Sequence, residues 1–134
     1  MTKAIDHAKH NYDVCIYLSK DKKFIDWVVT TAYYSAIYFT HHKLFPDRYS
    51  FKDRMNFYST FDSYARDYFL HNSKVNDSLH GIRKKLVEEH LSEISIEFSQ
   101  LKDFCWTARY KTYNINLDVN YIIELLDKIK KNCT

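Results

Sequence analysis

The stretch of sequence that decides the fold is residues 94–108, ISIEFSQLKDFCWTA. Its apolar residues recur at steps of four, three, four and three positions, and they are Ile94, Phe98, Leu101, Cys105 and Ala108. This spacing places all of them on one face of an α-helix, because a half-buried strand would need an apolar residue at every second position. We therefore expect a helix, opened by Ser92, whose apolar face lies in the core.

The same periodicity recurs on both sides of this stretch. It predicts helices over about residues 3–18 and 22–44, and a last helix capped by Asn116 or Asp118. Residues 22–44 form the most apolar segment, with one stripe made of Val28, Ala32, Ser35 and Phe39. Small side chains in that stripe allow a neighbouring helix to come close, so this helix is expected to be central.

Two further helices are predicted between residues 46 and 91. Pro46 should end the central helix, since proline cannot continue it, and Ser50 is the expected N-cap of the next one. The residues expected on one face of that helix are Phe51, Met55, Tyr58, Ala65 and Phe69. A second helix, capped by Asp77 or Ser78, should then place Leu79, Ile82, Leu86 and Val87 on its apolar face.

Composition sets the fold class. The chain has 134 residues but only one glycine and one proline, far fewer than the turns of a sheet-rich fold require. This length is typical of a single domain with a sizeable core. We therefore expect one all-α domain over residues 1–134, an up-and-down bundle of about five or six helices.

Charge and cysteine usage exclude some classes of protein. The formal net charge of +3 is a mild basic bias, below that of a dedicated nucleic-acid binder. The N-terminus has no apolar run, so neither a signal peptide nor a membrane anchor is expected and a cytoplasmic location is the default. The three cysteines show no CxxC spacing, and the pairs His7/His10 and His41/His42 lack a third ligand nearby. We expect two buried cysteines, one thiol in the tail, no metal site and no cofactor.

Three segments together resemble the HEPN family of small helical bundles. They are residues 26–39, DWVVTTAYYSAIYF, residues 78–87, SLHGIRKKLV, and residues 101–113, in which Ala108, Arg109 and Tyr110 end a helix. HEPN domains occur in prokaryotic toxin–antitoxin, phage-defence and nucleotidyltransferase-associated proteins. The resemblance implies a HEPN-like bundle, a homodimer that pairs through these helices, and a cognate protein partner such as a nucleotidyltransferase.

The resemblance also suggests where a functional site would lie. HEPN ribonucleases use an Arg followed four to six residues later by a His, because RNA cleavage needs a cation for the phosphorane and a group that moves protons near neutral pH. Here Arg109 is present but Asn114 stands where the His would be. An amide cannot act as acid or base, so the Arg109 to Asn114 corner, with Tyr110 and Tyr113, is expected to bind rather than to cut.

Other residues offer alternatives to this corner. Arg66 and His71 match the Arg–His spacing at a helix end and are the candidate catalytic pair if the protein is an enzyme. His80 and Arg83 lie one helical turn apart and could face an anion together; a composite of Arg109 with His80 across a dimer is a further possibility.

Three functions follow from these observations. The first is a HEPN-like domain that binds a nucleotide, an RNA or a protein partner and lacks the usual ribonuclease activity. The second is a metal-independent endoribonuclease of toxin–antitoxin or phage-defence type. The third is a helical adaptor that docks on a partner protein. The departure at Asn114 favours the first, so we expect a binding protein rather than an enzyme.

Overall fold

A computed structural model gives the three-dimensional arrangement of the chain and describes residues 2–45, 49–51, 56–58, 60–71 and 78–134. Within them the chain forms six α-helices and one short two-stranded ribbon. The helices are α1 (Ala4–Leu18), α2 (Ile25–Leu44), α3 (Phe61–His71), α4 (Leu79–His90), α5 (Ser95–Tyr110) and α6 (Val119–Cys133). The strands are β1 (Tyr49–Phe51) and β2 (Asn56–Tyr58), and 3-10 turns η1 (Lys22–Phe24) and η2 (Ser92–Ile94) precede α2 and α5. The all-α helical bundle predicted from the sequence is confirmed.

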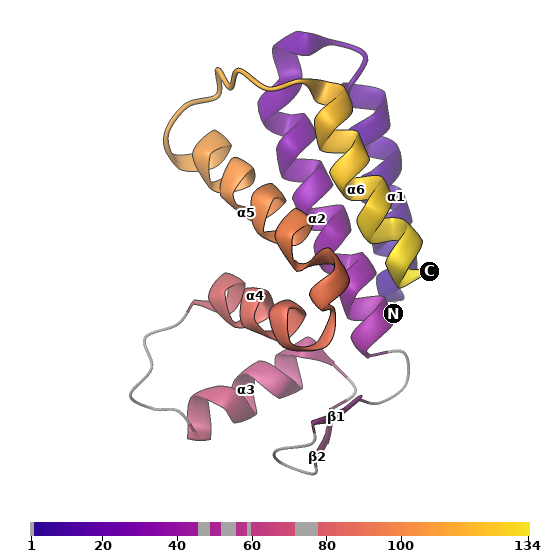
Figure 1. Cartoon of the computed structure of the whole chain (residues 1–134), viewed down its shortest axis with the longest axis vertical. Helices are drawn as coiled ribbons and strands as arrows, with labels where there is room; N and C mark the ends of the chain where they lie inside the picture. Colours follow the sequence, from indigo (N-terminus) through magenta and orange to yellow (C-terminus); the bar gives the residue numbers. More distant parts are fainter. Residues whose placement is uncertain (1, 46–48, 52–55, 59, 72–77) are drawn as a thin grey trace.

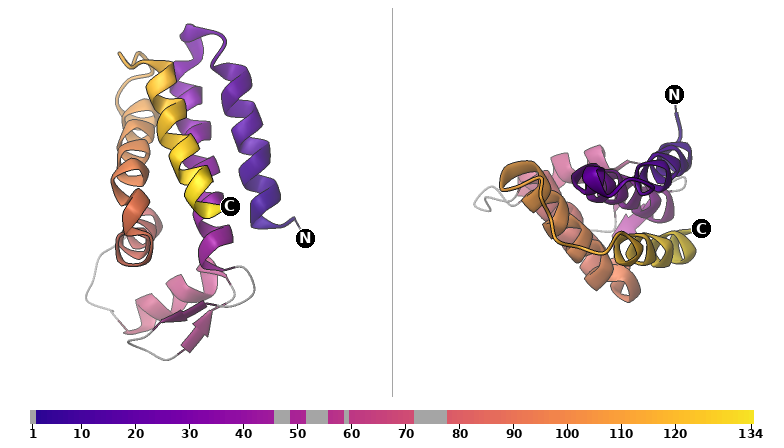
Figure 2. Two further views of the ribbon diagram at one scale, coloured as in Figure 1. Left: turned by 45° about the vertical axis from the view of Figure 1, so that its right-hand side comes forward. Right: turned by 90° about the horizontal axis from the view of Figure 1, so that it is seen from above.

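Helix α2 is the centre of the bundle. Helices α1, α5 and α6 surround it, with α1 and α5 running opposite to α2 and α6 running in the same direction (Figures 1 and 2). The two shorter helices α3 and α4 lie with the ribbon at the lower end of the bundle, around the C-terminal part of α2 (Figure 1). The fold therefore brings residues from α2, α4 and α5 together although they are far apart in the sequence.

The buried stripe of α2 explains why it is central. Val28, Ala32, Ser35 and Phe39 are completely buried, as the sequence predicts. The Ser35 hydroxyl donates a 2.8 Å hydrogen bond to the backbone carbonyl of Ala8, which lies on α1. A hydrogen bond from a serine side chain to the backbone of another helix requires the two helices to lie close together, which small side chains allow. The bond also gives a partner to a buried hydroxyl, whose burial without one would cost free energy.

Two of the predicted caps start their helices. The Ser78 hydroxyl accepts a hydrogen bond from the Gly81 amide and opens α4. The Asp118 carboxylate accepts one from the Asn120 amide and opens α6. Each bond satisfies a backbone N–H that has no partner inside the helix, which contributes about 1 kcal/mol.

The prediction of a helix from Ser50 is wrong. Residues 49–51 pair with 56–58 as antiparallel strands, with Tyr49 opposite Tyr58, and the helix begins only at Phe61. Aromatic side chains favour strands. The apolar residues of this segment also follow one another at steps of three and four positions, which is the spacing that predicted a helix. The predicted stop at Pro46, the expected apolar position Met55 and the alternative cap Asp77 lie outside the described residues.

All three cysteines are free and buried. Cys133, which the sequence predicted to be a tail thiol, lies on the inner face of α6 together with Ile122, Leu126 and Ile129. The amphipathic pattern of α6 therefore continues to the end of the helix. Burial raises the pKa of both Cys15 and Cys133 to about 11, so these thiols remain protonated at neutral pH.

Candidate functional site

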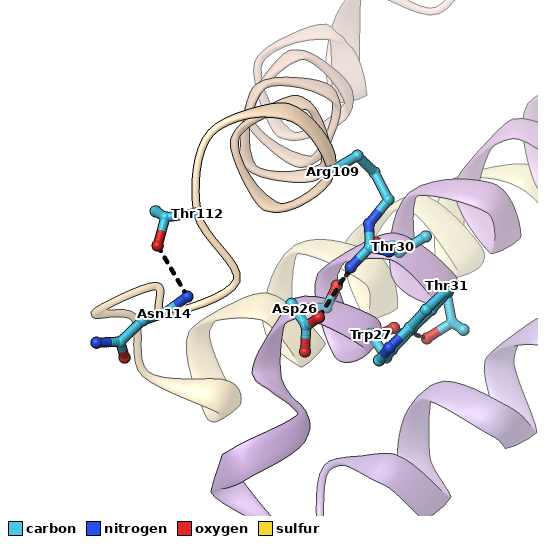
Figure 3. Close-up of polar contacts among 7 residues, drawn as sticks. All are labelled: Asp26, Trp27, Thr30, Thr31, Arg109, Thr112 and Asn114. Atoms are coloured by element: carbon cyan, nitrogen blue, oxygen red, sulfur yellow. Dashed lines mark hydrogen bonds and ion pairs between the residues drawn. The ribbon is translucent and has the colours of Figure 1, made fainter.

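Arg109, expected to bind a ligand, is engaged in an ion pair. Its Nη2 lies 2.9 Å from Oδ2 of Asp26, a buried residue in the first turn of α2 (Figure 3). Its guanidinium carbon is 4.0 Å from the ring centre of Trp27. Arg109 Nε is buried and has no hydrogen-bond acceptor within the described part of the chain. This arginine therefore joins the end of α5 to the start of α2, and Asp26 neutralises its charge.

The rest of the predicted corner does not converge on Arg109. The rings of Tyr110 and Tyr113 are 75% and 73% exposed, and the Asn114 side chain points away from Arg109 (Figure 3). Asn114 instead lines a polar hollow of about 760 Å³ between η1 and the connection from α5 to α6, where Lys22 also lies. The corner therefore consists of separate surfaces, and its role in binding stays a prediction.

The candidate pair Arg66 and His71 lies in the second half of α3. Arg66 is exposed to solvent. The side chain of His71 lies outside the described residues, so the proximity of the two side chains is not defined. Catalysis by this pair also stays a prediction.

His80 and Arg83, by contrast, are held together by two residues of α2. Arg83 Nε donates a hydrogen bond to Nε2 of His41 over 3.3 Å, and Arg83 Nη1 lies 3.4 Å from Nδ1 of His80. The Tyr33 hydroxyl lies 3.0 Å from the same His80 nitrogen. We call Tyr33, His41, His80 and Arg83 the Arg83 cluster. It forms where the first turns of α4, which begins at the Ser78 cap, pack against the middle and the C-terminal part of α2.

The hydrogen bonds constrain the two imidazoles to different degrees. A guanidinium can only donate, so His41 Nε2 accepts from Arg83 and carries a lone pair. At His80 the Tyr33 hydroxyl donates to Nδ1 or accepts from it, according to the tautomer of the ring. Burial and the neighbouring Arg83 charge lower the pKa of His41 to about 3. Burial, Arg83 and then Lys102 also lower the pKa of His80. Both histidines are therefore neutral at pH 7.

Arg83 itself is a partly buried cation with no ion-pair partner among the described residues. Its guanidinium carbon is 4.4 Å from the ring centre of Phe61, which in turn stacks on His41 with a centroid distance of 5.0 Å. Burial lowers the pKa of Arg83, an effect that attraction to Tyr33 and Asp62 opposes. The contacts that hold this guanidinium are thus aromatic rings and neutral imidazoles.

Sequence reasoning found only half of this cluster. His80 and Arg83 were predicted as anion contacts, whereas His41 was weighed only as a metal ligand and set aside because no third ligand stands nearby in the sequence. No local pattern links His41 to Arg83, because 42 positions separate them. The one signal available was that His41 lies in the last turn of α2 and Arg83 in the second turn of α4, near the parts of the chain where the two helices end and begin.

Other chemistries receive no support from the described part of the chain. Nowhere in it do three or more His, Cys, Asp or Glu side chains gather in a way that could hold a metal ion. It also contains no helix with both the length and the apolar character required to cross a bilayer. No protein-family model matches this chain, and no curated protein and no solved structure matches it either. The HEPN resemblance stays a prediction from the sequence motifs.

Proposed function

We propose that this protein binds the phosphate group of a nucleotide or an RNA through Arg83, within a HEPN-like domain. The observation that carries the proposal is the state of that guanidinium, which is partly buried and has no ion-pair partner among the described residues. A partly desolvated cation is stabilised by an anion, and phosphate fits the planar fork of arginine. Arg109 is the weaker candidate because Asp26 already neutralises it.

The rest of the Arg83 cluster supports this assignment. His41 accepts the hydrogen bond of Arg83 Nε and His80 lies beside Nη1, so these two residues orient the guanidinium. Its Nη2 makes no hydrogen bond within the described residues. Because both imidazoles are neutral, they hold the arginine without cancelling or repelling charge. Lys102 on α5 acts electrostatically on His80 and adds a second cation near the same place.

Three matched substitutions test the proposal. Arg83→Gln, Arg109→Gln and Arg66→Gln each remove one guanidinium, the first from the proposed site and the others from the two sites predicted from sequence. Affinity for a labelled RNA is measured by fluorescence anisotropy at low salt. Since a hydrogen bond to a charged group contributes about 1.5–3 kcal/mol, Arg83→Gln should weaken binding about 10- to 150-fold. The two other variants should bind within about 3-fold of the wild type.

The result also separates the remaining hypotheses. A loss confined to Arg109→Gln would support the Arg109 to Asn114 corner in place of the Arg83 cluster. RNA and nucleotide binding that is undetectable at low salt in the wild type would overturn the proposal and favour the helical adaptor. Circular dichroism of each variant shows whether a loss of affinity comes from a loss of fold.

The pairing of His80 with Arg83 favours a second candidate, the metal-independent endoribonuclease. In the tautomer whose Nδ1–H donates to Tyr33, Nε2 of the neutral His80 can accept the proton of a 2′-hydroxyl. The 2′-oxygen then attacks the phosphorus, the 5′-oxygen leaves, and the adjacent Arg83 guanidinium can stabilise the phosphorane that forms between these steps. Incubation of total RNA with the protein in EDTA tests it. Cleavage that disappears in His80→Gln but persists in Arg66→Gln would support this activity at the Arg83 cluster. RNA that stays intact at micromolar protein would contradict the endoribonuclease and leave phosphate binding as the proposed function.

A further inference from the structure

One face of α2 carries a stripe that the core covers only in part: Tyr38 packs against the core and stacks on His7 of α1, whereas the rings of Trp27 and Tyr34 stay exposed. Trp27, Thr31, Tyr34, Tyr38 and His41 follow one another at steps of four, three, four and three positions, so they share one side of the helix. None of the five is fully buried. Trp27 and Tyr34 remain 48% and 42% exposed, which is unusual for large aromatic rings on the central helix of a bundle.

An arginine from a neighbouring helix contacts each end of this stripe. At one end Arg83 of α4 donates its hydrogen bond to His41. At the other end the guanidinium carbon of Arg109, which lies on α5, is 4.0 Å from the ring centre of Trp27. Figure 3 shows these two side chains. His41 and Trp27 are 14 positions apart, which at a rise of about 1.5 Å per residue is about 21 Å along α2.

We propose that this α2 stripe binds single-stranded RNA, with the bases stacking on Tyr34 and Trp27 and a phosphate held by Arg83. The inference rests on the proposed function and extends it from one phosphate to a strand. Every base has an aromatic face, so stacking on exposed rings binds a strand with little dependence on its sequence. A duplex cannot use these rings, since its bases are already stacked and paired.

Charge favours a nucleic-acid strand over a second copy of this chain. The Arg83 guanidinium lacks an ion-pair partner among the described residues, and a strand supplies a phosphate to it while its bases cover the rings. In a two-fold dimer through the same face, the stripe of the second copy would offer no anion to Arg83, because its five residues include no carboxylate.

Tryptophan fluorescence gives a direct readout, because Trp27 and Trp106 are the two tryptophans of the chain. In a Trp106→Phe background Trp27 is the single tryptophan, so excitation at the red edge of the absorption band reports on it apart from the tyrosines. The protein is titrated with uridine monophosphate and with oligouridylates of about 4 to about 16 nucleotides, the range of known single-strand sites. The longer strands should quench Trp27 and bind at least about 10-fold more tightly than the mononucleotide, which reaches only Arg83.

Two ring deletions and one control complete the experiment. Trp27→Ala and Tyr34→Ala should each weaken binding of the longest oligouridylate about 5- to 150-fold, while Trp27→Ala leaves mononucleotide affinity unchanged. Tyr17→Ala removes a ring that is 72% exposed on α1, outside the stripe, and should have no effect. Circular dichroism shows whether Trp27→Ala is folded. If it is not, Tyr34→Ala still tests the contribution of the stripe.

The possible failures can be told apart. Mononucleotide binding that depends on Arg83, together with an oligouridylate that binds no more tightly and leaves Trp27 fluorescence unchanged, would overturn the stripe and keep the proposed function. An absence of binding by both ligands would overturn both. A sedimentation coefficient that falls in Tyr34→Ala, without a change in RNA affinity, would assign the stripe to contacts between copies of the chain.

Discussion

Lowering the pH from 7 to 5 should destabilise this protein through His41. In the folded state the pKa of His41 is lowered to about 3 by burial and by Arg83, whereas an unfolded histidine keeps a pKa of 6.5. Below pH 6.5 the unfolded chain therefore binds a proton that the folded chain does not, and stability falls with pH until about pH 3. Each tenfold rise in proton concentration costs about 1.4 kcal/mol, so His41 accounts for a loss of about 2 kcal/mol at pH 5.

Urea unfolding at pH 7 and at pH 5, followed by circular dichroism, measures this loss. The comparison is with His41→Gln, whose amide oxygen can accept the hydrogen bond from Arg83 but does not titrate. The variant should lose about 2 kcal/mol less than the wild type between the two pH values. His80, whose pKa is also lowered, is present in both proteins and cancels. Equal losses in the two proteins would refute the burial of a neutral His41 against Arg83.

Three further outcomes test the fold and the chemistry of its side chains. Asp26→Asn should lower the free energy of unfolding by about 1–3 kcal/mol in urea titrations, since it breaks the partly buried ion pair with Arg109; an unchanged midpoint would contradict that contact. Phe98→Ala should lower it by about 3–5 kcal/mol, because Phe98 is completely buried, and a loss below 1 kcal/mol would contradict the core packing. Cys15 and Cys133 should react with a disulfide reagent at pH 8 only after denaturation, because burial raises the pKa of both; rapid labelling of the native protein would argue against it.

The helices could be predicted from sequence because their signals are local. The spacing of Phe98, Leu101 and Cys105 depends on the helical period alone, and all three are buried as expected. The caps Ser78 and Asp118 also act within a few residues of their own position. The ribbon at residues 49–51 and 56–58 was missed because aromatic residues suit strands as well as helices, and pairing between strands decided the outcome.

The candidate site could not be predicted in the same way, because it depends on contacts between distant helices. Whether an arginine is neutralised is decided by its partner. Arg109 meets Asp26, which lies 83 positions earlier, whereas Arg83 meets His41 and His80. Neither partner is visible in the residues around the arginine. The sequence therefore identified His80 and Arg83 as candidates but ranked the Arg109 corner above them.

The salt dependence of RNA binding tests the central claim most directly. For single strands, each phosphate contact contributes about 0.7 to the slope of log affinity against log salt concentration. If Arg83 holds a phosphate, Arg83→Gln should reduce the magnitude of this slope by about 0.7, while Arg66→Gln leaves it unchanged. Identical slopes for the wild type and Arg83→Gln would contradict a phosphate contact at Arg83.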